Sequence, residues 1–575
     1  MNRKLRSTAL LLTLCMLFSL TAVSQEAVWK PYDENGNPIR TDRDATGTNG
    51  VVASSNFYAS RVGLSVLEKG GNAIDAAIAT AYALGVVEPF TSGLGGGGFM
   101  LIHSAQTGED VFIDFRERAP RLATPAMWPI DEDGKVIGSQ TSLGGKSVGV
   151  PGEVAGFEYA LEKFGSLTRE EIMQPAIDLA TDGYLVSLNM NIAATDNFDY
   201  MVKYPELGHY YLAQSGLPYE VGDLYKNPDL AKTLKMIAKD GKDAFYKGEV
   251  AQAFVDTVQK YGGVITLKDL EEYEVKVRTP VTSTYHGYQV ISAPPASSGG
   301  THLIEILNIL ENFDLGSMEV NSAPYLHLFS EAFKLAFADR SAYMADTDFQ
   351  KVPLSGLTSK EYAKLLAQKI DVSKSQTYTA DDPSKYESGS TTHLSIADKA
   401  GNMVAVTKTI NYFWGSKVAI EGYGFIANDE MDDFVPGTES VNRIEGGKRP
   451  LSSMTPTVIL TDKGEPFMTV GSPGGLRIFP TVAQVISRVI DHGMTIQEAI
   501  DAPRIFDNAG NKINYESGGN GLSPETVAKL QEMGHEVVDR GEWNNYFGGV
   551  QGIVYTQDGL HGGADPRRDG KALGY

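Results

Sequence analysis

A threonine that follows a long polar segment is the best candidate nucleophile in this chain. Residues 371–390, DVSKSQTYTADDPSKYESGS, are polar and show no hydrophobic periodicity, which predicts a flexible surface segment. Thr391 comes directly after it, at the start of a strand-like sequence. A threonine hydroxyl is a weak nucleophile unless a base takes its proton, and a threonine at a chain start has that base in its own α-amino group. An ordinary linker between domains is the alternative for residues 371–390.

Self-cleavage of the Ser390–Thr391 bond would create such a chain start. The Thr391 hydroxyl would attack the carbonyl carbon of Ser390, and water would then hydrolyse the ester. The reference pKa of an α-amino group, about 7.7–8.0, suits proton transfer near neutral pH. Because threonine-rich strands are common and usually structural, this pattern needs support from other residues.

A β-hairpin is predicted to position the threonine. Residues 391–411, TTHLSIADKAGNMVAVTKTIN, alternate apolar and polar side chains around a turn-forming stretch at 398–402. If the turn centres on Ala400, residues whose numbers sum to 800 face each other across the ladder. Thr391 then lies opposite Thr409, within side-chain reach.

The preceding chain predicts the layers around this hairpin. Residues 53–87 predict two alanine-rich helices that are separated at Gly70-Gly71 and packed in a buried layer. Residues 99–104 and 111–115 predict a second hairpin, and residues 167–370 predict a mainly helical region.

Several separate motifs, in order along nearly the whole chain, resemble those of γ-glutamyltranspeptidases, also called glutathione hydrolases. They are EPFTSGLGGGGFML (88–101), DFRERAP (114–120), TTHLS (391–395), TINYFWGS (409–416), NDEMDDF (428–434), KRPLSSMTPT (448–457), GSPGG (471–475) and GGADPRRDGKALGY (562–575). The resemblance implies an α/β (α+β) fold, the four-layer αββα sandwich of N-terminal-nucleophile hydrolases. It also implies one large domain formed after cleavage by a heterodimer of a large chain, 25–390, and a small chain, 391–575.

The resemblance also implies roles for individual residues. Thr391 would be the nucleophile and Thr409 would support its hydroxyl. The α-carboxylate of the donor would be held by Arg116, Ser452 and Ser453, its α-amino group by Asn411, Glu430 and Asp433, and the oxyanion by Gly474 and Gly475.

These residue types suit a γ-glutamyl group, whose far end is a zwitterion that needs partners for both charges once it leaves water. An arginine fork and serine hydroxyls match a carboxylate, acidic side chains match an ammonium, and glycine backbone can approach an oxyanion closely. Each residue also has an ordinary reading. Arg116 could be a surface residue, Glu430 and Asp432-Asp433 a solvated loop, Ser452-Ser453 a turn, and Gly474-Gly475 the end of a strand at 467–470. The assignment depends on their joint presence.

Two further patterns predict no cofactor or catalytic metal. The glycine run at 93–98 matches G-x-G-x-x-G, but the strand-like FMLIH follows it where a nucleotide site needs a helix, so we expect tight packing instead. The nine histidines include no metal-ligand pair such as H-E-x-x-H. His393 alternates away from Leu394, which favours a structural role in the core or at the surface.

The N-terminus predicts export. Three basic residues precede an apolar stretch at 8–23, and Ala22-Val23-Ser24 suits a signal peptidase, so residues 1–24 are expected to be a signal peptide. A retained membrane anchor is the alternative, but the stretch is too short to span a bilayer comfortably. A periplasmic or extracellular location follows from this prediction.

Composition excludes several classes of function. Cys15 is the only cysteine and lies in the predicted signal peptide, which excludes a catalytic cysteine, a cysteine-ligated zinc and an iron–sulfur cluster in the mature chain. Loss of three basic residues with the signal peptide takes the net charge from −22 to −25. So negative a chain disfavours nucleic acid and anionic membranes as partners. No segment after the signal peptide is apolar enough for stable membrane insertion.

The sequence therefore predicts a γ-glutamyltransferase and glutathione hydrolase that passes the glutamyl group to water, an amino acid or a dipeptide. A sibling acylase for poly-γ-glutamate or glutaryl amides and an exported binding protein for acidic amino acids are the alternatives. Many relatives have a longer lid loop where this chain has only residues 434–447, which predicts a more open site and good cleavage of bulky donors.

Overall fold

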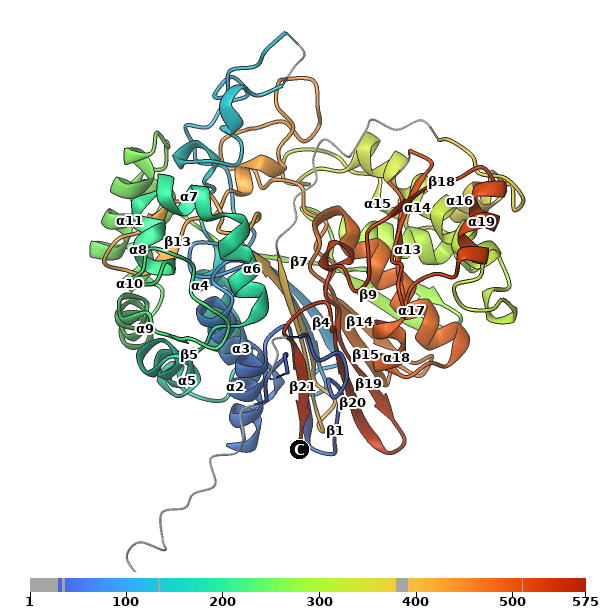
Figure 1. The fold of residues 1–575 in the computed structure, drawn as a ribbon, viewed down its shortest axis with the longest axis horizontal. Helices are drawn as coiled ribbons and strands as arrows, with labels where there is room; N and C mark the ends of the chain where they lie inside the picture. The colour runs from blue at the N-terminus through green and yellow to red at the C-terminus, as the bar shows by residue number, and fades with distance from the viewer. Residues whose placement is uncertain (1–28, 34–36, 133–134, 379–390, 509) are drawn as a thin grey trace, which may run out of the picture.

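Two seven-stranded antiparallel sheets face each other at the centre of the molecule, and helices cover the outer face of each (Figure 1). The computed structural model describes residues 29–575 except 34–36, 133–134, 379–390 and 509. The four αββα layers confirm the fold expected from the sequence motifs. The predicted signal peptide and Ser390 lie outside the described residues.

The two sheets share the same size and are built from distant parts of the chain. Sheet I has the order β1 (Ala45–Gly47), β20 (Gly559–Ala564), β19 (Gln551–Thr556), β15 (Pro466–Gly471), β14 (Thr457–Leu460), β9 (Tyr288–Ser292) and β8 (Val281–Tyr285). Sheet II has the order β21 (Lys571–Gly574), β2 (Gly50–Ser54), β10 (Thr392–Asp398), β11 (Met403–Thr409), β3 (Gly97–Ser104), β4 (Glu109–Asp114) and β7 (Lys276–Arg278).

The helices divide between the two outer layers. The layer on sheet II contains α2 (Phe57–Glu68), α3 (Ala73–Val87), α4 (Glu153–Phe164), α5 (Arg169–Asp182), α6 (Leu188–Asp196), α7 (Phe198–Lys203), α8 (Pro205–Tyr211), α9 (Pro228–Asp240), α10 (Asp243–Tyr246), α11 (Gly248–Lys260) and α12 (Leu267–Glu271). The layer on sheet I contains α13 (Gly299–Leu310), α14 (Ala323–Tyr343), α15 (Leu354–Leu357), α16 (Lys360–Ala367), α17 (Ile478–His492), α18 (Ile496–Asp501) and α19 (Pro524–Glu532).

Shorter elements complete the fold. They are the strand pairs β5 (Tyr184–Leu185) with β6 (Leu224–Tyr225) and β12 (Ala419–Ile420) with β13 (Phe425–Ile426), the small sheet β16 (Ile505–Phe506), β17 (Lys512–Tyr515) and β18 (Glu536–Asp539), and the 3₁₀ turns η1 (Ile137–Ser139), η2 (Gly145–Ser147), η3 (Leu315–Ser317), η5 (Glu430–Asp433), η6 (Gly475–Arg477) and η7 (Asn545–Phe547).

Side-chain alternation separates the buried layers. In β10, Leu394 and Ile396 face the helices of sheet II, whereas Ala397 faces sheet I together with Met403 of β11. Since successive side chains of a strand point to opposite faces, the odd-numbered residues of β10 and β11 line the space between the sheets. Thr391 and Thr409 lie at the end of this odd-numbered row.

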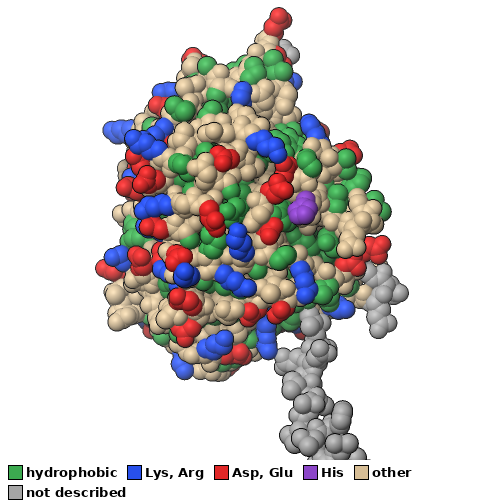
Figure 2. Space-filling model, turned by 90° about the vertical axis from the view of Figure 1, so that its left-hand side faces the viewer, with side chains coloured by type: hydrophobic (Ala, Val, Ile, Leu, Met, Phe, Trp, Pro, Cys, Tyr) green, Lys and Arg blue, Asp and Glu red, His purple; other side chains and the backbone are tan. Residues whose placement is uncertain are grey.

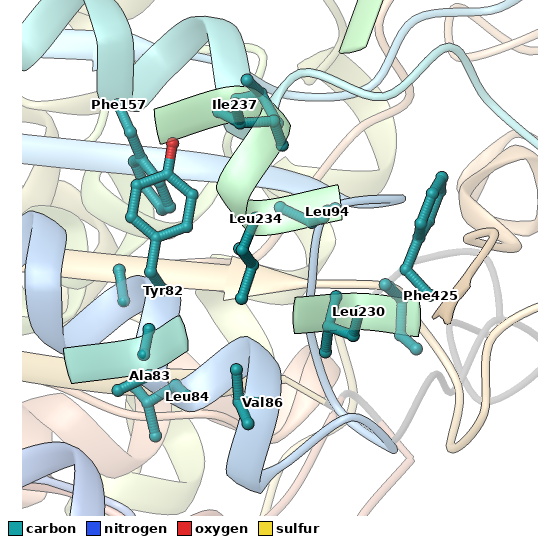
Figure 3. Close-up of a cluster of buried hydrophobic side chains, with 14 of the residues drawn as sticks. Tyr82, Ala83, Leu84, Val86, Leu94, Phe157, Leu230, Leu234, Ile237 and Phe425 are labelled. Carbon is teal, nitrogen blue, oxygen red and sulfur yellow. The ribbon is translucent and has the colours of Figure 1, made fainter. Parts of the chain in front are cut away.

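The alanine-rich helices are confirmed as a buried layer. α3 begins at a capping box in which Asn72 and Asp75 satisfy each other's backbone N–H groups. Leu230 and Leu234 of α9, with Phe157 of α4, pack beside it (Figure 3). The prediction was wrong at its start, because Ala53 belongs to β2.

The region predicted as mainly helical, 167–370, also contains three strands of the central sheets. β8 and β9 form a hairpin whose turn residues His286 and Gly287 have positive φ angles of 46° and 88°. This conformation matches the twist of paired strands, so the hairpin is favoured locally. The short alternation in VTSTYHGYQVIS was its signal in the sequence.

The segment before Thr391 is partly described. Residues 371–378 are anchored, because the Ser375 backbone N–H donates to the carbonyl of Met533 over 2.8 Å and the Tyr378 hydroxyl donates to Glu331 over 2.9 Å. The rest of the segment predicted to be flexible, 379–390, lies outside the described residues.

Surface charge and helix hydrophobicity affect which partners a protein favours or disfavours. Figure 2 shows one face of the molecule, on which acidic and basic side chains are interspersed instead of being separated by sign. Within the part of the chain that the structure describes, no helix is long and apolar enough to cross a membrane.

The glycine run provides the tight packing expected from the sequence. β3 begins at Gly97 and pairs with β11, so the run leads into a strand and not into a nucleotide-binding helix. A Cβ on Gly96 would lie 2.0 Å from the carbonyl oxygen of Thr409, and one on Gly98 would lie 2.3 Å from that of Thr407. Only residues without a side chain allow this approach.

Gly96→Ala is therefore expected to destabilise the fold by about 2 kcal/mol or more, because the backbone that it meets cannot move aside cheaply. Gly356→Ala is the matched control, since no heavy atom lies within 4 Å of its added Cβ in α15. Thermal unfolding of both variants tests this. A Gly96→Ala protein as stable as the control would contradict the tight packing.

Candidate active site

The predicted register between β10 and β11 is confirmed. Thr392 pairs with Lys408 and His393 with Thr407, so facing residues sum to 800. The Thr391 hydroxyl donates to Thr409 Oγ1 over 3.3 Å, and the backbone N–H of Asn411 donates to the same oxygen over 2.8 Å. The Thr409 hydroxyl is thus held by the turn that follows β11 and accepts from the candidate nucleophile.

His393 has the structural role that alternation favoured. It is fully buried, and its ring contacts the hydroxyls of Thr407 at 2.8 Å and Ser395 at 3.1 Å. Burial lowers the pKa of His393 to about 3, so the ring is neutral at physiological pH.

A cavity of about 470 Å³ opens at Thr391 and contains nearly all of the predicted site. This volume lies in the range of small-molecule sites. Of the predicted residues, those that line the cavity are Arg116, Thr391, Thr409, Asn411, Glu430, Asp433, Ser452, Ser453 and Gly475. Gly474 adjoins the lining residue Gly475 and is not itself in the lining.

Arg116 is buried directly after β4 and contacts both predicted acids. Its guanidinium donates to Glu430 through Nη1 and to Asp433 through Nη2, so it bridges the two ends of η5. Its backbone carbonyl accepts from the Tyr273 hydroxyl over 2.8 Å, which fixes the chain at this point. The motif resemblance grouped Arg116 with Ser452 and Ser453 as partners of the donor carboxylate, whereas in the structure its guanidinium contacts the two acids.

Burial affects the pKa values of Arg116 and Glu430. Burial would lower the pKa of Arg116, but the carboxylates of Glu430 and Asp433 outweigh it and raise that pKa. Burial raises the pKa of Glu430 to about 8, with nearby Asp433 adding to the effect and Arg116 opposing it. The site therefore holds a permanent cation beside a carboxyl that can change charge near neutral pH.

Asn411 lies between the nucleophile and the acids. Its φ angle of 72° is in the left-handed region, which asparagine tolerates better than most residues. Its side chain donates to the carbonyl of Asp429 over 3.1 Å, next to Glu430. The turn after β11 thus directs this amide toward the acidic side of the cavity.

The two serines are held by a strand-like pairing with the segment before α13. The backbone N–H of Ser452 donates to the carbonyl of Ala296 over 2.9 Å, and that of Ser298 donates to the Ser452 carbonyl over 2.8 Å. The Ser452 hydroxyl accepts from the Met454 backbone N–H over 3.1 Å. Serine hydroxyls held in this way can still donate their protons into the cavity.

Gly474 and Gly475 follow β15 and lead into η6 and α17. Their φ angles are 132° and 57°, conformations that favour glycine. The N–H groups of the first helical turn are not needed within the helix and are available to an anion. This supports the predicted oxyanion role for the pair.

The short loop at 434–447 forms one wall of the cavity. Every residue from Val435 to Asn442 lines it, and the Asn442 side chain closes the loop by donating to the carbonyl of Asp433 over 2.7 Å. Phe434 and Ile444 anchor the loop in a small apolar cluster with Trp128. Even this short loop thus contributes a wall, and the expectation of a more open site stays a prediction.

The cavity also contains residues that sequence reasoning missed. Arg340, Ser341, Ala342 and Met344 line it from the end of α14 and the residue that follows the helix. Nothing in the local pattern of this helix distinguishes Arg340 from a surface arginine, so only the packing of α14 against the serine segment reveals it.

Among the described residues, one group of possible metal ligands lies outside the cavity lining. His327, Glu331 and His535 are buried together, with His327 Nδ1 2.8 Å from His535 Nε2. The buried ammonium of Lys334 lies 2.5 Å from Glu331, which opposes a second cation there. The group has no contact with the nucleophile and supports no catalytic metal.

Comparison with known proteins covers most of the chain. The family profile described as gamma-glutamyltranspeptidase matches residues 59–575. The glutathione hydrolase proenzyme of Escherichia coli (strain K12) is 42% identical over 545 residues, which cover 92% of each chain. The acylase ACY 1 proenzyme of Pseudomonas sp. (strain SE83) is 40% identical and covers 92% of this chain and 94% of its own length.

Solved structures agree with this placement. The cephalosporin acylase from Bacillus halodurans superposes with a TM-score of 0.84 at 29% identity, over 95% of this chain and 99% of that one. Helicobacter pylori gamma-glutamyltranspeptidase superposes with a TM-score of 0.54 at 42% identity, over 60% of this chain and 96% of that one. Since the matches extend over the strands, the cavity and the candidate nucleophile together, the chain belongs to the gamma-glutamyltranspeptidase family.

Proposed function

We propose that this protein is a self-processing γ-glutamyltransferase and glutathione hydrolase with Thr391 as its nucleophile. The observation that carries the proposal is one cavity in which the Thr391 hydroxyl shares the lining with Arg116, Glu430 and Asp433. A nucleophile beside a cation and two acids suits a donor that ends in a zwitterion. The names of the relatives, several of which are glutathione hydrolase proenzymes, support the same activity.

Processing supplies the catalytic base. The Thr391 hydroxyl attacks the carbonyl carbon of Ser390, the peptide nitrogen becomes the free amine of Thr391, and water hydrolyses the ester to release the carboxyl of Ser390. The two chains stay together as a heterodimer through the sheets that both contribute to.

Catalysis then repeats this chemistry on the donor. The Thr391 amine takes the hydroxyl proton as Oγ1 attacks the γ-carbonyl carbon, and it returns a proton to the departing amine. Thr409 holds the hydroxyl in place, and backbone N–H groups at Gly474 and Gly475 stabilise the oxyanion. Water, an amino acid or a dipeptide then attacks the ester and releases the glutamyl group.

The acids favour a γ-glutamyl donor over the amides of the acylase alternative. A glutaryl amide lacks the α-amino group, so Glu430 and Asp433, which already share the one guanidinium of Arg116, would gain no second cation from it. An exported binding protein for acidic amino acids would need neither a proenzyme nor a strand-end threonine. We further propose residues 1–24 as a signal peptide and a periplasmic or extracellular location for the enzyme.

Thr391→Ala is expected to leave one uncut chain without activity, because the same hydroxyl performs processing and catalysis. The native protein should separate on a denaturing gel into chains of about 40 and about 20 kDa, since mass follows residue count. Normal cleavage of the Thr391→Ala chain would refute the role of Thr391.

Arg116→Lys is expected to self-process but to lose about 2–3 kcal/mol of transition-state binding for γ-glutamyl donors, because an ammonium cannot contact both acids as a planar fork does. The ratio of kcat/KM for the variant and the native enzyme measures this loss. Equal values in fully processed proteins would place Arg116 outside the functional site.

Glu430→Gln should change how KM depends on pH. Burial raises the pKa of Glu430 to about 8, so this carboxyl is mostly protonated below pH 8. Because a donor ammonium favours the ionised form, binding must expel the proton, and KM should rise as pH falls, by at most about tenfold per pH unit. In Glu430→Gln this dependence should flatten between pH 6 and 8, while the acid limb of kcat, which belongs to the Thr391 amine, should remain. An unchanged slope of KM would show that another group binds the ammonium.

A further inference from the structure

The segment that follows β11 has a strained backbone at three residues that are not glycine. Asn411, Trp414 and Lys417 have φ angles of 72°, 65° and 69°, in the left-handed region. Asparagine tolerates this region, whereas tryptophan and lysine occupy it only at an energetic cost. Because such a conformation persists only where surrounding contacts fix it, residues 410–417 must be held by their neighbours.

Asp429 contacts the first part of this segment through both its side chain and its backbone. Its Oδ1 accepts from the backbone N–H of Tyr412 over 3.0 Å, its own N–H donates to the carbonyl of Ile410 over 3.2 Å, and its carbonyl accepts from the Asn411 side chain over 3.1 Å. Asn411 is therefore held on both sides by Asp429. The Asp429 side chain is buried and is not in the cavity lining, so it can act on the cavity only through its neighbours.

Asp429 also begins η5, the 3₁₀ turn that contains Glu430 and Asp433. Its carbonyl accepts from the backbone N–H of Asp432 over 3.1 Å, in addition to the amide of Asn411. One residue thus connects the turn that carries Asn411 to the turn that carries the acids. An ammonium that contacts both turns needs a fixed spacing between them, and the contacts of Asp429 set this spacing.

The ammonium of Lys417 holds the second part of the strained segment. It donates to the carbonyls of Phe413 and Gly415, the latter over 3.1 Å. Burial raises the pKa of Asp429 well above its usual range, and the positive charge of Lys417 opposes that rise. The Oδ1 atom of Asp429 can accept from Tyr412 whether the carboxyl is ionised or neutral. The hydrogen bond, and not the charge, therefore fixes the turn.

We propose that Asp429 is a positioning residue for the ammonium site of the donor. Through Tyr412 it holds Asn411 in its left-handed conformation, and through η5 it fixes the spacing between Asn411 and Glu430. The proposal rests on the proposed function, since it concerns the α-amino group of the same γ-glutamyl donor. Loss of the Asp429 side chain should therefore weaken the binding of a donor only where the donor carries that ammonium.

Two donors that differ only in the ammonium test this proposal. The native enzyme, Asp429→Ala and Asp429→Asn are compared on the γ-glutamyl anilide and on the glutaryl anilide, which lacks the α-amino group. Enzyme in excess over donor gives kcat/KM for a slow donor. If the glutaryl anilide is cleaved too slowly even so, inhibition of γ-glutamyl anilide cleavage by glutamate and by glutarate gives the same comparison. Denaturing gels and thermal unfolding show whether each variant is processed and folded.

Asp75→Ala is the matched control. Asp75 is also a buried aspartate whose carboxylate accepts from backbone N–H groups, those of Asn72 and Ser166, each over 2.9 Å. It lies outside the cavity lining. Asp75→Ala should lower the melting temperature without separating the two donors.

Asp429→Ala should raise KM for the γ-glutamyl anilide about 10- to 30-fold and change kcat less than about threefold, because the ammonium site loses its geometry while the nucleophile keeps its own. The value of kcat/KM for the glutaryl anilide should change less than about threefold. Asp429→Asn should stay within about threefold of the native enzyme with both donors, since its amide oxygen can accept from Tyr412 in the same place. If Asp429→Ala fails to fold or to be processed, Asp429→Ser, whose hydroxyl is too short to reach Tyr412, should show the same donor pattern.

Three results would overturn the proposal. Native KM values in Asp429→Ala would mean that the turn holds its shape without Asp429, and an equal loss with both donors would mean that Asp429 only supports the fold. A loss in Asp429→Asn as large as that in Asp429→Ala would mean that the charge of Asp429 matters and not its hydrogen bond. Failure of the proposed function is distinct from all three, because a native enzyme that stays uncut or hydrolyses no γ-glutamyl anilide would refute the activity itself.

Discussion

The hydrogen-bonded ladder between β10 and β11 is the constraint on which the active site depends. It sets Thr391 opposite Thr409 at the end of the row that lines the space between the sheets. The glycine run that leads into β3 lets a third backbone lie against β11, with the carbonyl oxygen of Thr409 only 2.0 Å from where a Cβ of Gly96 would be. Backbone pairing therefore places the proposed nucleophile, and this suits a residue that would have to react both before and after the chain is cut.

The charged side chains that line the cavity are the second constraint on the site. Arg116 bridges Glu430 and Asp433 in the free protein, so a donor does not meet two bare acids. The ammonium of the proposed donor would join an arrangement in which the carboxyl of Glu430 can still take up or lose a proton. Such a site discriminates by charge, because a neutral group in place of the ammonium gains nothing from the acids while it displaces their water.

The sequence predicted what periodicity and compact motifs encode. The Thr391–Thr409 register followed from alternation around a turn, and Arg116, Asn411 and Ser452 lie in motifs that resemble the family directly. Arg340 was missed because its place in the cavity comes from the approach of α14 to Ser453, more than a hundred residues away, which no local pattern records. The pairing of Arg116 with the acids was missed for the same reason. The β8–β9 hairpin was overlooked for a different reason. Its alternation of apolar and polar residues is short, and the sequence before and after it predicts helices.

The proposed cleavage point, between residues 390 and 391, divides the residues of the site between the two chains. Arg116 and Arg340 precede this cleavage point, whereas Glu430 and Ser453 follow it, so the contacts of Arg116 with Glu430 and of Arg340 with Ser453 cross it. β10 likewise pairs with β2 on one side and β11 on the other. These ion pairs, hydrogen bonds and ladders do not pass through the Ser390–Thr391 peptide bond, so the proposed cleavage would leave them intact while it releases the amine that the proposed nucleophile needs. Cleavage would thus activate the enzyme without rebuilding the pocket in which the donor is proposed to bind.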